Sequence, residues 1–540
     1  MTTRLDKVNT IIGTTELTIQ VRNQETVNTI AKEIHESPEL ANRITTIDIL
    51  TDEGDDKGEE EQEKKILGTS AVEKQKDELV SSQTNEHTEA EKKDTKHLPS
   101  AEERLIARKA AQEEGARLAT RLCEPLIQIL HSTTNLKHFH WRASYCAGTS
   151  FTRPHSFWAA LFSHSLSLQT LQLDYFEREV DQLPLPQTTF PKLQTLKLNA
   201  VSAHGDDGTA IDALLASCPS LVYLDFAWPR CDLDGCQIQN IFWGYGFPLL
   251  TRVSLSGWNF APKSLHAFLE RHATVETFSD GIDYYEGDSG SEPRSLDKHV
   301  LPNLRALNKS SGPLTKVQAY FNEDAKRPIR HLALHVGFHA RSVLTDLSKL
   351  PRVKAELEIL ELHGNVTDWR ELEPDSSDED GEDEGDDKES YQHPAPMPQV
   401  LRACLAGFEK LQELGLGLES GLITHRRKDG KFGHPDAATA EDLKYLLSHI
   451  PQTIPVRALR IWDGRAETLP QDFLDDLPPV PDYLEYFDWE GEERAVLRLE
   501  RKEGKVRAVV HRDYRGKKAE AEILTKMKKD WSGRRVLDFY

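Results

Sequence analysis

The sequence predicts an α/β solenoid, in which short strands and outer helices alternate along the chain. Two nine-residue segments support this prediction because they share one pattern. The first is FPKLQTLKL, from Phe190 to Leu198, and the second is CPSLVYLDF, from Cys218 to Phe226. In both, a proline precedes a short apolar strand, and a helix-like stretch lies between them. A strand and a helix that recur at a regular step indicate an array of stacked units.

The strand pattern has apolar residues at positions 1, 4 and 6, and it recurs over most of the chain. The fourth position falls at Leu171, Leu196, Leu224, Val253, Phe278, Leu307, Leu332 and Leu360. An LxxLxL strand that recurs, as here, at steps of roughly 25–29 residues is typical of a leucine-rich repeat. We therefore predict an irregular, ribonuclease-inhibitor-like leucine-rich repeat solenoid with a parallel concave sheet and outer helices. Positions 1, 4 and 6 should form its core, and positions 2, 3 and 5 should face out on the concave side.

Composition divides the chain into four parts. Residues 1–50 contain a helix-like stretch and a strand, and we interpret them as an N-terminal cap with a first repeat-like unit. Residues 51–100 are dominated by charged and hydroxyl side chains, which bury too little apolar surface to offset their ordering entropy, so we expect disorder. Residues 101–490 hold the repeat array. Residues 491–540 should form a β-hairpin and a basic helix that cap it, with Lys526, Lys528 and Lys529 in the helix.

The step from Leu360 to Leu414 is about twice as long as each of the steps between Leu171 and Leu360. The extra length contains the acidic run DSSDEDGEDEGDD. Like charges repel one another, so we expect residues 371–395 to form a disordered loop. Ser376 and Ser377 stand directly before acidic residues, which is the context that acidophilic kinases favour. Phosphorylation there would add negative charge, and an unmodified, solvated loop is the alternative.

The overall charge and the cysteines limit the classes of function. The 540 residues carry a net charge of −22, from 67 basic and 89 acidic side chains, and this balance argues against general nucleic-acid binding. No apolar run approaches the ~18 residues of a membrane-spanning helix. The first ten residues lack the apolar core of a signal peptide. Six scattered cysteines without a CxxC pair suit a reducing compartment. We therefore expect a cytoplasmic or nuclear protein that does not enter membranes.

No motif in the chain predicts catalysis, a cofactor or a metal site. The tetrapeptide GDSG at residues 287–290 is similar to a protease nucleophile loop, but the residues after it differ and no supporting fold pattern is present. The Gly-Leu-Gly of residues 415–417 only approximates a nucleotide-binding loop, because no acidic ribose partner follows it. The histidines cluster at positions 138, 140, 331, 335 and 339, but a zinc site needs four arranged ligands. We predict that the protein is not an enzyme and holds no cofactor or metal.

The concave surface is the predicted binding site, and its partner is expected to be a protein. Its charges are mixed and it includes tyrosine and arginine, residue types that anchor protein interfaces. The predicted partner-binding residues are His138, His140, Tyr223, Asp225, Arg252, His331, Glu361, Arg460 and Tyr486.

A family resemblance extends this prediction. The entry segment ESPELANRITTIDI, from Glu36 to Ile49, followed by the irregular repeats quoted above, resembles the leucine-rich repeat region of fungal F-box-type proteins over roughly residues 25–50 and 115–490. The resemblance implies a recognition scaffold whose repeats bind a substrate, and a link to the adaptor subunit of a cullin-type ubiquitin ligase. Residues 1–24 contain no recognisable F-box. The alternative is a leucine-rich repeat protein that regulates a GTPase or another enzyme.

Overall fold

The structure is a computed structural model that describes the chain in separate stretches. The described residues are 16–20, 24–51, 123–143, 153–176, 188–200, 213–228, 246–258, 262–283, 297, 299–309, 327–335, 340–363, 397–417, 425–426, 432–433, 440–462, 469, 473, 477, 480–490, 494–502 and 505–511. The predicted disordered segments lie outside these ranges, apart from Thr51, as do Ser376, Ser377, the GDSG tetrapeptide and the predicted basic helix. The chain forms two compact units, residues 1–250 and residues 251–540.

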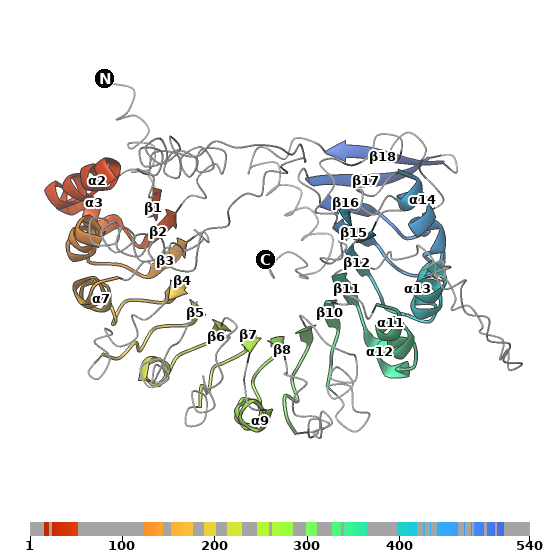
Figure 1. The fold of residues 1–540 in the computed structure, drawn as a ribbon, viewed down its shortest axis with the longest axis horizontal. Helices are drawn as coiled ribbons and strands as arrows, with labels where there is room; N and C mark the ends of the chain where they lie inside the picture. Colours follow the sequence, from red (N-terminus) through yellow and green to blue (C-terminus); the bar gives the residue numbers. More distant parts are fainter. Residues whose placement is uncertain are drawn as a thin grey trace, which may run out of the picture. The chain divides into compact units, whose positions relative to one another are not determined.

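The first unit is built on a parallel sheet whose strands are neighbours in chain order. These strands are β1 (Glu16–Gln20), β2 (Thr46–Thr51), β3 (His138–Ala143), β4 (Thr170–Phe176), β5 (Thr195–Ala200) and β6 (Tyr223–Trp228). The helices are α2 (Gln24–Glu36), α3 (Pro38–Arg43) and α7 (His155–Phe162), with further helical turns at residues 123–132 and 213–216. The labelled helices of this unit lie on one side of its row of strands (Figure 1).

The second unit continues the same alternation and ends in an antiparallel hairpin. Its parallel strands are β7 (Arg252–Trp258), β8 (Thr277–Asp283), β9 (Ala306–Lys309), β10 (His331–His335), β11 (Ile359–His363), β12 (Glu413–Gly417), β15 (Ala458–Trp462) and β16 (Tyr486–Glu490). The hairpin strands are β17 (Arg494–Lys502) and β18 (Lys505–His511), and β17 pairs antiparallel with β16. A separate short pair consists of β13 (His425–Arg426) and β14 (Phe432–Gly433).

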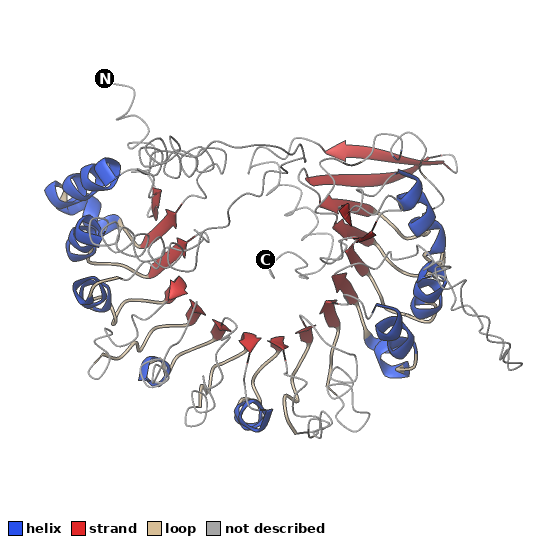
Figure 2. Ribbon diagram, viewed as in Figure 1, coloured by secondary structure: helices blue, strands red, loops and turns tan. Residues whose placement is uncertain are grey.

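Helices cover one face of the sheet in the second unit as well. They are α9 (Pro262–Arg271), α11 (Ala340–Ser348), α12 (Pro351–Glu356), α13 (Met397–Leu405) and α14 (Ala440–His449). Figure 2 shows them together on one side of the strands of this unit. No helix within the described ranges is both long and apolar enough to span a bilayer. The α/β class and the mostly parallel, open sheet are thus confirmed, and the antiparallel β16–β17–β18 end is the departure from a uniform parallel array.

The core of each unit lies between the sheet and its helices. In β3, Phe139 and Trp141 occupy positions 4 and 6, are at most 2% exposed, and lie 6.0 Å and 5.4 Å from the Phe157 ring of α7. In β16, the position-4 residue Phe487 lies 5.3 Å from Phe473. Because side chains alternate along a strand, positions 3, 5 and 7 point to the opposite face. We call the sheet face opposite the described helices the far face of each unit.

A repeated backbone contact fixes which residues lie side by side on the far face. The carbonyl at position 2 of one repeat accepts hydrogen bonds from the amides at positions 2 and 3 of the next. For example, the Arg305 carbonyl accepts bonds from the amides of Arg330 (2.8 Å) and His331 (3.1 Å). The Arg457 carbonyl accepts the equivalent bonds from Glu485 and Tyr486, at 2.8 Å and 3.0 Å. Residues at equal positions of neighbouring repeats therefore form rows, and neighbours within a row lie about 4.8 Å apart.

Candidate functional site

The structure places every predicted partner-binding residue at position 3 or 5 of a strand. They are His138 and His140 in β3, Tyr223 and Asp225 in β6, Arg252 in β7, His331 in β10, Glu361 in β11, Arg460 in β15 and Tyr486 in β16. By strand alternation all of them belong to the far face of their unit. The structure gathers some of them into small groups and leaves others apart.

In the first unit the groups are small. The ring of His138 shares a 3.0 Å hydrogen bond with the Thr170 hydroxyl, and burial, with the charge of a neighbouring lysine, lowers the pKa of this histidine. The Tyr223 hydroxyl donates a 3.0 Å bond to the Asp225 carboxylate. The Lys197 ammonium lies 5.3 Å from the centre of the Tyr223 ring. These contacts join two neighbouring strands at most.

The second unit contains a larger group centred on Glu361. The Glu361 carboxylate lies 3.7 Å from the Nε2 atom of His331 and 3.2 Å from the Nε2 atom of His363. Only 5% of the Glu361 side chain is exposed. Burial alone would raise the pKa of Glu361, but hydrogen bonds and charge from the two imidazoles outweigh it and hold the pKa at about 2. Glu361 therefore carries a negative charge throughout the physiological range.

A glycine in β12 makes room for an indole ring beside Glu361. A Cβ atom added to Gly415 would lie 2.4 Å from Cη2 of Trp462 and 2.7 Å from Cζ3, so the ring covers the Gly415 backbone. Gly417 pairs in register with Trp462 itself. The far end of the indole reaches β11, where the His363 ring lies 4.6 Å away at an interplanar angle of 33°. The Gly-Leu-Gly of residues 415–417 is thus a strand segment that accommodates Trp462.

An ion pair extends the group toward the end of the repeats. Arg460 donates a 2.8 Å hydrogen bond from Nε to the Asp488 carboxylate, and each side chain is 8% exposed. The Arg460 guanidinium also lies 5.7 Å from the centre of the Trp462 ring. We call the residues His331, Glu361, His363, Arg460, Trp462 and Asp488 the Glu361 cluster. Tyr486, at position 3 of β16, is 8% exposed.

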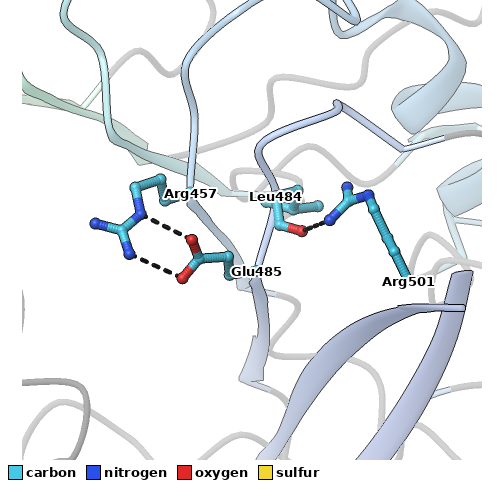
Figure 3. Close-up of polar contacts among 4 residues, drawn as sticks. All are labelled: Arg457, Leu484, Glu485 and Arg501. Carbon is cyan, nitrogen blue, oxygen red and sulfur yellow. Dashed lines mark hydrogen bonds and ion pairs between the residues drawn. The ribbon is translucent and has the colours of Figure 1, made fainter. Parts of the chain in front are cut away.

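Charged residues at position 2, just before each strand begins, form contacts beside the cluster. Figure 3 shows Arg457 and Glu485 in a two-point contact, with N···O distances of 3.1 Å and 2.9 Å. The same figure shows Arg501 of β17 donating a 2.8 Å bond to the Leu484 carbonyl. Arg501 also donates a 2.6 Å bond to the Pro481 carbonyl. These bonds attach the hairpin to the segment that leads into the last parallel strand, β16.

The cluster offers groups for recognition. It provides an ionised carboxylate, two imidazoles, a partly buried indole and a guanidinium paired with a carboxylate. Within the described stretches, no group of three or more His, Cys, Asp or Glu residues is arranged to hold a metal ion. Burial raises the pKa of the Cys218 and Cys404 thiols to about 12, so both stay protonated near neutral pH. Neither is therefore an activated nucleophile.

Sequence reasoning found three members of the cluster and missed the others. His363 and Trp462 stand at position 7, one residue beyond the pattern that defined the concave surface. Asp488 is at position 5, as Arg460 is, so the same rule would have found it. His335, four residues after His331 in the sequence, pairs with His363 in register, and His339 lies outside the described stretches.

No protein-family model matches this sequence, and a search of curated proteins finds no relative of it.

Proposed function

We propose that the chain is a non-catalytic recognition scaffold of the leucine-rich repeat type, which binds a protein partner on the far face of its second unit. The observation that carries the proposal is the Glu361 cluster. It concentrates tryptophan and arginine with a neighbouring tyrosine, and these residue types dominate the binding energy of protein interfaces. They lie on adjacent parallel strands, in register, on the face that the helices leave uncovered.

The repeat pattern supports the leucine-rich repeat part of the proposal. From Leu171 to Leu360 the strands recur at a nearly constant step, and the residues at positions 1, 4 and 6 are buried in repeat after repeat. Leu357, Leu360 and Leu362 of the β11 repeat, for example, are all 0% exposed. Such a unit buries its apolar side only by stacking on its neighbours, so an array is required and a long polar sheet face results.

The contacts within the cluster reduce the cost of binding. Trp462 is already restrained by Gly415 beneath it and by the His363 ring beside it. Immobilising a flexible side chain at an interface costs about 0.5–1.5 kcal/mol, and a side chain that is already ordered in the free protein avoids that cost. The cluster is therefore a preorganised anchor for a partner.

The cysteines support an intracellular setting for this scaffold. Cys123, Cys218 and Cys404 are all buried and unbridged. Together with the scattered cysteine pattern, they fit the cytoplasm or the nucleus, where thiols stay reduced. The resemblance to F-box-type repeat proteins suggests one specific form of the proposal, in which the scaffold is the substrate receptor of a cullin-type ubiquitin ligase.

Affinity purification with mass spectrometry tests the proposal. The tagged full-length protein should retain a partner that Trp462→Ala loses. Tyr445→Ala is the matched control, because Tyr445 is 45% exposed and lies on α14, on the helix side of the same unit. Circular dichroism must show that both variants fold. A partner retained by Trp462→Ala but lost with Tyr445→Ala would place binding on the helix side and refute the proposal.

The same purification tests the ubiquitin-ligase form separately. Recovery of a cullin and its adaptor subunit together with the partner would support the substrate-receptor role. Recovery of the partner without them would leave a plain scaffold and reject only that role.

A further inference from the structure

The partner's chemistry follows from the charges on the far face of β10–β16, and this inference rests on the proposed function. The described side chains at positions 3, 5 and 7 include three carboxylates, of Glu361, Glu413 and Asp488. Against them stands one guanidinium, of Arg460, which is already paired with Asp488. The three carboxylates and the one guanidinium together carry an excess of two negative charges.

Burial makes this negative charge effective at the surface. Glu361 and Glu413 are each 4% exposed, and Asp488 is 5% exposed. Salt screens buried charges less than exposed ones, and low-dielectric surroundings focus their field toward solvent. The field should therefore attract and orient a positively charged group.

An aromatic side chain, Trp462, lies on the same face as these carboxylates. Trp462 is partly exposed, in contrast to the neighbouring core residue Ile461, which is 0% exposed. Indole is the best aromatic acceptor for the ammonium of lysine or the guanidinium of arginine. The face thus combines an acidic field with an ordered indole.

We propose that the far face of β10–β16 binds a basic segment of the partner protein, with Trp462 as its aromatic anchor. Lysine or arginine side chains of that segment contact the indole, and the carboxylates of Glu361, Glu413 and Asp488 supply the attracting charge. The Arg460–Asp488 pair keeps one part of the face neutral and so limits where the basic side chains sit.

A labelled lysine octapeptide is the probe for this proposal, with a glutamate octapeptide as the negative control. Its Kd is measured with the full-length protein, Trp462→Ala, Trp462→Phe, Glu361→Gln and the helix-side control Tyr445→Ala. We expect Trp462→Ala to weaken binding about tenfold, as for an interface hot spot. Trp462→Phe and Glu361→Gln should weaken it less, and Tyr445→Ala should leave it unchanged. Because the chain has other acidic segments, the differences between variants are the readout.

Equal affinity of the probe for all variants would overturn the proposal. So would a wild-type dimer in size-exclusion chromatography that Trp462→Ala dissociates, because a second copy would then occupy the face. If Lys526→Gln, Lys528→Gln and Lys529→Gln together tighten probe binding tenfold, the chain's own basic residues occupy the face and the partner assignment is wrong. A partner lost with Trp462→Ala, while probe binding is unaffected, would reject the basic segment and keep the proposed scaffold.

Discussion

Glu361 shows how a buried charge is stabilised by its neighbours. The side chain is almost fully buried, yet two imidazoles hold its pKa at about 2, below the value of 4.5 expected for an unfolded chain. Between these two values the unfolded state binds more protons than the folded state. The contribution of Glu361 to stability is therefore complete above about pH 4.5 and is lost as the pH falls through about 2.

We expect Glu361→Gln to remove this part of the acid sensitivity. The wild type should lose about 2–3 kcal/mol more than the variant between pH 5 and pH 2, as a shift of this size implies. Urea unfolding at several pH values measures the difference. Glu356→Gln is the control, because Glu356 lies on α12 with its side chain 41% exposed. Parallel pH profiles for wild type and Glu361→Gln would contradict the ion-pair account.

Gly415 is required by the ring above it. Adding one methyl group in Gly415→Ala would force Trp462 to move, because the added carbon lies 2.4 Å from a ring atom. We expect a loss of about 1–3 kcal/mol in the free energy of unfolding, as for other overpacked sites. Gly246→Ala is the control, since an added carbon there meets nothing within 4 Å. Trp462→Ala should relieve the strain, so the double variant should be less destabilised by Gly415→Ala than the wild type is.

At the scale of elements, Arg501 adds two side-chain bonds to the β16–β17 strand pairing that holds the hairpin. Arg501→Ala leaves the Leu484 and Pro481 carbonyls without this donor. We expect a loss of about 1–2 kcal/mol, with faster hydrogen exchange in β17 and β18. Arg498→Ala, an exposed position on the same strand, should have little effect. Unchanged exchange in Arg501→Ala would show that strand pairing alone holds the hairpin.

The strands could be predicted from the sequence, while some helices could not. Apolar residues at positions 1, 4 and 6 point to one side, and positions 1 and 4 stay apolar in every repeat because each strand faces the same kind of core. Position 6 departs from the pattern in two repeats, with Asp280 in β8 and Lys309 in β9. Helix α7, with the sequence HSFWAALF, escapes such reasoning because it is apolar almost all round and has no polar stripe. Helix α12 begins with Pro351 and has only six residues, too few to show a helical period in the sequence.

The Glu361 cluster could be predicted only in part, for a different reason. Positions 3 and 5 give His331, Glu361 and Arg460. Contacts between repeats, however, depend on side-chain length and on whether the intervening strand carries a side chain at that position. Trp462 reaches His363 because Gly415 stands between them without a side chain. A pattern that treats each repeat separately cannot reveal a contact across three strands.

At the scale of the whole array, stability should be shared between neighbouring repeats. Leu360 is 0% exposed at the centre of β11, so Leu360→Ala should cost about 2–5 kcal/mol. In a stacked array the loss spreads mainly to adjacent repeats. Hydrogen exchange should therefore accelerate in β10 and β12 more than in β7. Equal acceleration in all strands of the second unit would indicate one cooperative core instead.

The backbone contact at position 2 has a consequence for engineering. The step from Leu360 to Leu414 is about twice the usual one, yet the Glu358 carbonyl accepts the same two bonds, from Gln412 and Glu413, that shorter steps provide. Thr45 likewise accepts bonds from Lys137 and His138, across a connection that is longer still. Neighbouring strands thus align in the same way whether the connection between them is short or long. A reporter domain inserted into either long connection should leave the pairing of the flanking strands intact. The two connections are therefore suitable insertion sites for the design of a biosensor.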